Sequence, residues 1–74
     1  MTKTIFQARV TTEGDIWVST VDIPEIGDFQ SEADAPELID WHTRTSICAF
    51  TEMDPFDFEV HYEFTSGAPK YYLD

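Results

Sequence analysis

The residues best suited to chemistry lie between Phe56 and Phe64, where a histidine stands among carboxylates. His61 alternates with Glu59 and Glu63 in the stretch FDFEVHYEF. Such a group could in principle bind a divalent metal. Residues two apart along a strand, however, are separated by about 7 Å, which is too far for one ion without added ligands. The pattern therefore predicts a charged surface and no metal site.

Three other candidates also favour a non-catalytic protein. His42 has no evident nucleophile or orienting group of the kind that a catalytic base needs. The carboxylates between Glu52 and Glu59 superficially resemble a calcium loop, but the glycine required for its sharp turn is missing. Cys48 is the single cysteine, which excludes an internal disulfide and favours a small buried side chain. We expect no enzymatic activity and no cofactor.

Apolar alternation predicts the elements that carry these residues. In residues 56–64, large apolar side chains occupy every second position, which is the period of a half-buried strand. Similar patterns predict strands over residues 4–12 and 16–23, joined by a turn at Gly14, and a short strand near residues 26–30. The result is an α+β fold: a small antiparallel sheet of three to four strands with one helix packed on one face, in the order β-β-β-α-β. Residues 1–65 form the domain and 66–74 a tail.

A helix is predicted to begin at Asp34 and to end before Pro55. Asp34 and Glu37 have the spacing of a capping box, with Pro36 in the first turn. The predicted apolar side carries Ala35, Leu38, Ile39, His42, Thr45 and Ala49. On this phase Ile47 falls on the polar side, where it would be exposed and could mark a contact surface.

The charge balance indicates which partners the chain can bind. Fifteen Asp and Glu stand against four Lys and Arg, for a net charge of -11. Direct binding to nucleic acid or to anionic lipid requires a basic surface, so a basic protein is the favoured partner. The alternative is that the acidity serves solubility alone. The chain shows neither a signal peptide nor a membrane span, and with one cysteine we expect a cytoplasmic protein.

Several landmarks between Gly14 and Ile39 resemble the N-terminal domain of HicB-type antitoxins. They are the hairpin glycine, an aromatic-rich strand with Trp17, the turn D-I-P at residues 22–24, a short strand at Phe29 and the predicted helix start. The similarity extends over residues 4–64. It implies a fold that blocks a small, basic, RNA-cleaving toxin. Many such proteins also carry a C-terminal DNA-binding segment. No basic helix follows the last predicted strand in this sequence, so we do not expect transcriptional repression by this chain alone.

The function predicted from the sequence is inhibition of a basic nucleic-acid-handling protein, such as a small ribonuclease toxin. One alternative is a phage- or plasmid-encoded nucleic-acid mimic that inhibits a nucleic-acid-binding defence protein, as an anti-CRISPR or anti-restriction protein does. Another is a self-associating structural domain, such as a homodimer. Carboxylates would steer the partner and aromatic side chains would anchor it. The predicted partner-binding residues are Asp28, Glu32, Asp34, Glu37, Asp40, Trp41, Ile47, Asp57, Glu59, Glu63, Tyr71 and Tyr72.

Overall fold

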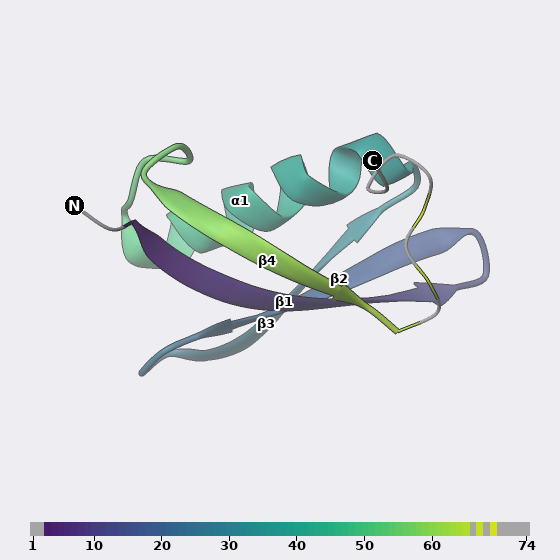
Figure 1. Ribbon diagram of the computed structural model, residues 1–74, viewed down its shortest axis with the longest axis horizontal. Helices are drawn as coiled ribbons and strands as arrows, with labels where there is room; N and C mark the ends of the chain where they lie inside the picture. Colours follow the sequence, from purple (N-terminus) through teal and green to yellow (C-terminus); the bar gives the residue numbers. More distant parts are fainter. Residues whose placement is uncertain (1–2, 66, 68, 70–74) are drawn as a thin grey trace.

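A single α-helix packs on one face of a four-stranded sheet in the computed structural model, which describes residues 3–65, 67 and 69 (Figure 1). The elements are β1 (Thr4–Glu13), β2 (Ile16–Ile23), β3 (Gly27–Ala33), the 3-10 turn η1 (Pro36–Leu38), α1 (Ile39–Thr51) and β4 (Phe58–Phe64). The predicted α+β class and the β-β-β-α-β order are confirmed. Tyr71 and Tyr72 lie outside the described residues.

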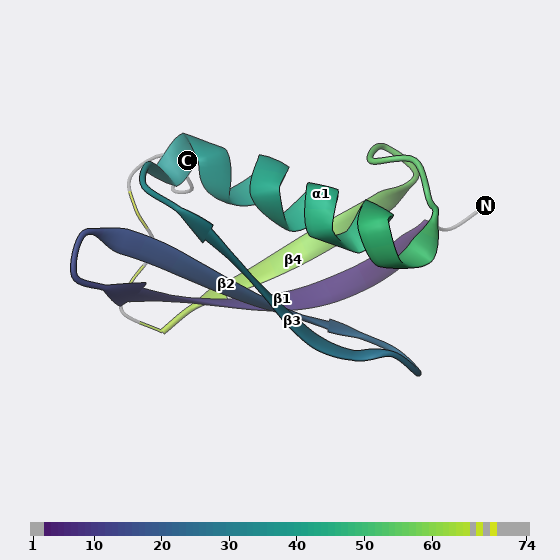
Figure 2. The ribbon, with the colours of Figure 1, turned by 180° about the vertical axis from the view of Figure 1, so that it is seen from behind.

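The sheet is mixed, with strand order β3-β2-β1-β4. β1, β2 and β3 pair antiparallel as a meander, whereas β4 pairs parallel to β1. The prediction of an antiparallel sheet is therefore correct for three strands and wrong for β4. The reason is that α1 carries the chain back across one face of the sheet, so β4 starts at the same end as β1 (Figure 2).

Alternating side chains from the strands and one stripe of α1 form the core. Phe6, Ala8 and Val10 of β1 are buried against α1, as the alternation predicts, while Gln7 and Arg9 point away and are exposed. The last strand begins at Phe58, which is 1% exposed. Phe56, predicted to lie within this strand, instead belongs to the preceding turn and is 72% exposed.

The predicted phase of the helix is wrong. Its buried residues are Ile39, Thr43 and Ile47, spaced four apart along one face, and Ile47 is 0% exposed. The predicted apolar side included Ala35 and Leu38, which belong to a bend and to the 3-10 turn. Those residues do not share the 3.6-residue phase of α1, and counting them rotates the apparent face.

The predicted capping box is also absent. Asp34 lies in the bend before η1, the N-cap of η1 is Ala35, and no side-chain hydrogen bond caps either η1 or α1. Pro36 does occupy the first turn, where its missing N–H leaves no bond unmade.

Polar side chains tie α1 to the strands beneath it. The Thr43 hydroxyl lies 2.8 Å from that of Ser19 on β2, and both residues are buried. Asp40 accepts a hydrogen bond from the Tyr62 hydroxyl of β4 and another from Arg44 on the next turn. These bonds fix the rotation of α1 over the sheet. Neither helix in the described part of the chain has the length and hydropathy that crossing a bilayer requires.

Candidate functional site

The face of the sheet opposite α1, called the open face here, collects most of the charged side chains of the strands. The paired registers place Asp28 of β3, Asp22 of β2, Gln7 of β1 and His61 of β4 in one row across the sheet. The neighbouring row consists of Gln30, Thr20, Arg9 and Glu63. Glu32 and Glu59 share the same face by alternation along β3 and β4. Glu13 lies on this face by the same alternation along β1, so the strands place six carboxylates there beside one arginine and one histidine.

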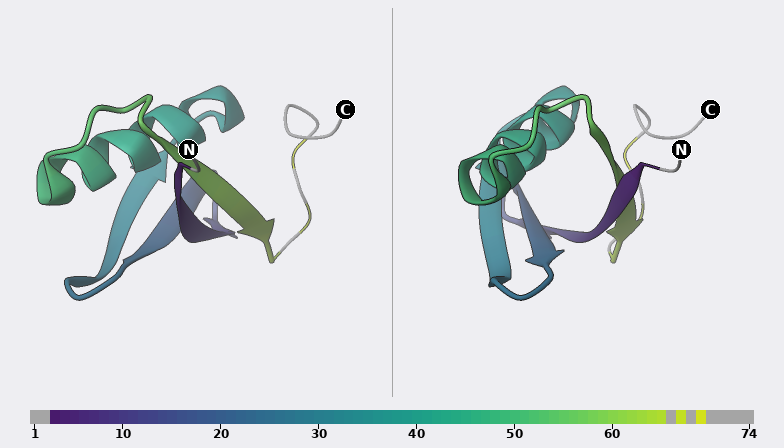
Figure 3. Two further views of the ribbon diagram at one scale, coloured as in Figure 1. Left: turned by 60° about the vertical axis from the view of Figure 1, so that its left-hand side comes forward. Right: turned by 90° about the vertical axis from the view of Figure 1, so that its left-hand side faces the viewer.

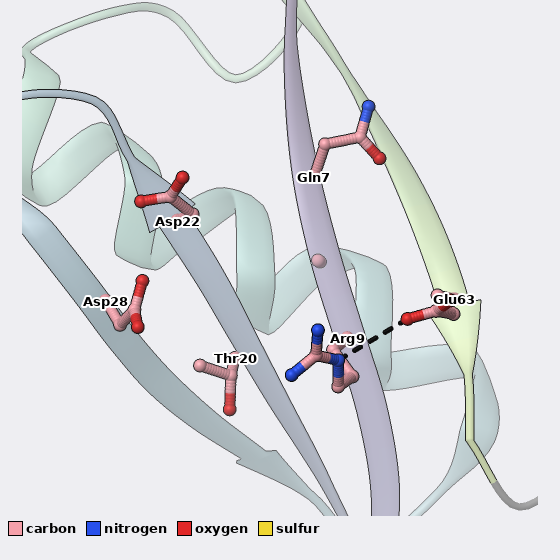
Figure 4. Close-up of a pocket in the computed structure, with 7 residues that line it drawn as sticks. Gln7, Arg9, Thr20, Asp22, Asp28 and Glu63 are labelled. Atoms are coloured by element: carbon pink, nitrogen blue, oxygen red, sulfur yellow. Dashed lines mark hydrogen bonds and ion pairs between the residues drawn. The ribbon is translucent and has the colours of Figure 1, made fainter.

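A shallow hollow lies within this face (Figure 4). Its volume is about 470 Å³, and the side chains around it come from all four strands. In Figure 4, Asp22 and Asp28 stand together on one side of the hollow, and Arg9 reaches toward Glu63 on the other. The lining residues are Gln7, Ala8, Arg9, Thr20, Asp22, Asp28 and Glu63.

Asp22 and Asp28 are a pair of like charges in direct cross-strand register. Such pairs destabilise a sheet, although exposure to water weakens the repulsion. Across the hollow, Arg9 Nε lies 3.4 Å from a Glu63 carboxylate oxygen, with side chains 71% and 74% exposed. An ion pair this exposed contributes little stability. The negative charge of the face is therefore only partly neutralised, and the face favours cationic groups.

Four predicted partner-binding residues come together on the open face: Asp28, Glu32, Glu59 and Glu63. Sequence reasoning missed the other residues of the hollow, above all Asp22 and Arg9. The alternation of apolar and polar residues along β1 and β2 could have identified both residues. Each occupies a position on its strand whose neighbours one residue away are buried, so a polar residue there must face away from the core.

The remaining predicted residues within the described part of the chain do not join this face. Asp34, Glu37 and Asp57 are exposed in the segments that connect the strands and helix. Asp40 is half-buried in the network with Arg44 and Tyr62. Trp41 is 53% exposed on α1, on the helix side of the molecule.

Ile47 is part of the core, so it cannot act as a surface contact.

The geometry of the described residues offers electrostatic contacts to a charged partner. His61 Nε2 lies 3.9 Å from Glu59, and both side chains are about half exposed. His42 Nδ1 lies 2.7 Å from the Glu32 carbonyl oxygen, so this nitrogen is the donor. Within residues 3–65, 67 and 69, no three His, Cys, Asp or Glu side chains form a group that could hold a metal ion.

Comparison with known proteins adds no assignment. No protein-family model matches the chain, and no curated protein or solved structure matches it.

Proposed function

We propose that this chain is a non-enzymatic, acidic binding protein that inhibits a basic nucleic-acid-handling protein by covering its positive site. A HicB-type antitoxin would act in this way on a ribonuclease toxin. The observation that carries the proposal is the open face, where Asp22, Asp28, Glu32, Glu59 and Glu63 are gathered. Among the strand residues on this face, Arg9 is the one permanent cation. Such a face attracts basic partners over long range and rejects acidic ones.

The direct opposition of Asp22 and Asp28 supports a binding role for this face. Like charges in cross-strand register cost stability, and local rules of folding are commonly broken at functional sites. A purely solubilising surface gains nothing from placing two carboxylates in register beside a hollow. A cationic side chain seated between them would relieve the repulsion, so binding and charge compensation would coincide.

The test is capture of partners from the source cell with the tagged full chain, at low and at high salt, with captured proteins identified by mass spectrometry. We expect a basic nucleic-acid-binding protein that is lost as salt rises, because exposed charges are screened. A small ribonuclease would favour the antitoxin function, and a nuclease or defence complex would favour the nucleic-acid mimic. Recovery of this chain alone would contradict both and favour self-association.

A matched pair of variants locates the binding face. The first carries Asp22→Asn and Asp28→Asn on the open face. The second carries Asp15→Asn and Asp54→Asn, in the β1–β2 turn and the loop before β4. Both lose the same charge, and the first relieves a repulsion, so it should remain folded. We expect the open-face variant to weaken capture at least tenfold and the control variant to leave it nearly unchanged. Equal losses would mean that net charge alone drives capture.

A further inference from the structure

A second hollow lies at the end of β3, where the chain leads into η1 and α1. α1 crosses the sheet above β3 and β2, which brings its first turn close to the last residues of β3 (Figure 3). The hollow has a volume of about 280 Å³ and is lined by Ile16, Glu32, Ala33, Asp34 and His42. It shares no residue with the hollow of the open face.

The lining combines an apolar part with two carboxylates. Ile16, which is 39% exposed, and the buried Ala33 supply the apolar part. Glu32 and Asp34 are both exposed and supply two negative charges. Such a lining suits a side chain that has an apolar stem and a cationic end, as lysine and arginine have.

His42 adds a third polar group to the hollow. Its Nδ1–H donates a hydrogen bond to the Glu32 carbonyl oxygen at 2.7 Å, and this bond holds the ring against β3. In the neutral imidazole the other ring nitrogen, Nε2, is then a hydrogen-bond acceptor. The two carboxylates and this nitrogen can all accept hydrogen bonds from a ligand that donates several.

The described residues of the chain do not supply a cation to this hollow. Lys3, Arg9 and Arg44 are the three lysines and arginines that the structure describes. Their partners lie elsewhere: a backbone carbonyl in the turn before β4, the Glu63 carboxylate and the Asp40 carboxylate, respectively. We therefore expect a partner to bring the positive charge that complements the hollow.

The spacing of the two carboxylates favours arginine over lysine. Positions two apart in an extended segment, such as those of Glu32 and Asp34, are separated by about 7 Å. A guanidinium is planar and carries donors on opposite edges, so it can bond two separate carboxylates at once. An ammonium offers its three donors from a single atom and must draw its acceptors together.

We propose that this hollow seats the guanidinium group of one arginine side chain of the basic partner, with the stem of that arginine against Ile16 and Ala33. The proposal rests on the proposed function and adds a second point of contact to the open face. Glu32 follows Asp28 by four residues on β3, which is about 13 Å at about 3.3 Å per residue. A partner that engages both hollows therefore presents two basic side chains about 13 Å apart.

The test uses three blocked tripeptides that differ only in the residue between two glycines: arginine, lysine or citrulline. Citrulline has nearly the shape of arginine but no charge. Each peptide is titrated into the ¹⁵N-labelled full chain at low salt, and the amide and imidazole chemical shifts are followed by NMR. We expect the arginine peptide to shift the signals of Ile16, Ala33 and His42 in a saturable way. It should bind there at least threefold more tightly than the lysine peptide, and the citrulline peptide should leave these signals unchanged.

A matched pair of variants provides the second readout. Asp34→Asn removes one carboxylate of the hollow, whereas Asp54→Asn removes the same charge from the loop before β4. We expect Asp34→Asn to weaken the arginine peptide at least fivefold at this hollow and Asp54→Asn to weaken it less than twofold. Equal shifts with the citrulline peptide, equal losses in the two variants, or shifts confined to the surroundings of Asp22 and Asp28 would overturn the arginine site.

Capture of partners from the cell separates this proposal from the function on which it rests. Saturable binding of the arginine peptide in the hollow, while the cell yields no basic protein, would support the arginine site and count against the proposed function. Capture of a basic protein equally by the parent chain and by Asp34→Asn, with no peptide bound in the hollow, would overturn the arginine site and leave the proposed function standing.

Discussion

Arg44 is the residue whose removal should most sharply test the account of how α1 is held over the sheet. Its side chain is only 19% exposed. The guanidinium donates to Asp40 Oδ2 at 2.9 Å and to the backbone carbonyls of Pro55 and Phe58. It also lies 5.3 Å from the centroid of the Phe58 ring, within cation–π range. One side chain thus joins α1 to the turn before β4 and to β4 itself.

The expected cost of Arg44→Ala follows from these contacts. A hydrogen bond to a charged group contributes about 1.5–3 kcal/mol to stability. The three bonds come from one guanidinium group, so their contributions are not simply additive. Truncation also removes the cation beside the half-buried Asp40, although Asp40 still accepts the hydrogen bond from the Tyr62 hydroxyl. We expect a loss of about 3 kcal/mol in the free energy of unfolding, a large share of the 5–15 kcal/mol typical of a domain.

Arg9→Ala is the matched control, because it removes the same side chain and the same charge from an exposed site. Its ion pair with Glu63 should be worth about 0.5 kcal/mol. The assay is equilibrium urea unfolding of both variants and of the parent chain, extrapolated linearly to water. Equal losses for the two variants, or a loss under about 1 kcal/mol for Arg44→Ala, would refute the view that a half-buried network anchors α1 to β4.

Two further stability predictions use the same assay. Thr43→Val should cost about 1.5 kcal/mol, since the buried Ser19 hydroxyl loses its partner; adding Ser19→Ala should recover most of that loss, and strictly additive costs would contradict the pairing. Glu25→Gly should stabilise the chain by about 0.5–1 kcal/mol, because Glu25 has φ of 70° after Pro24 in a turn position that favours glycine. Glu13→Gly, at a strand position without positive φ, should instead destabilise it, and a gain in both variants would show that the backbone conformation at Glu25 is not the cause.

Strand positions were predictable because a strand imposes a strict period of two. Phe6, Ala8 and Val10 alternate with polar residues, and their burial follows from that alternation alone. The helix was predictable in existence but not in phase, since a bend and a 3-10 turn precede α1 and shift the apparent stripe. Ile47 was therefore predicted to lie on the surface, whereas it belongs to the core cluster that contains Phe6 and Phe58.

The candidate site was predictable only in part. Alternation along β3 and β4 indicates that Glu32, Glu59 and Glu63 face away from the core, but it does not say which strands are neighbours. The parallel pairing of β1 with β4 brings Arg9 beside Glu63, 54 residues further along the chain. A hairpin between consecutive strands can be predicted from the residues of its turn. The pairing of β1 with β4, which are separated in the chain by α1, depends on how the helix packs on the sheet.

By itself, the amino-acid sequence determined the α+β class, the order of the elements, the acidic balance and the two-faced character of the strands, because each of these follows from local composition and period. Tertiary structure decided the mixed sheet, the rotation of α1, the register that opposes Asp22 to Asp28 and the position of β4 next to β1. These features depend on contacts between residues far apart in the chain, and such contacts are chosen by the packing of the whole domain.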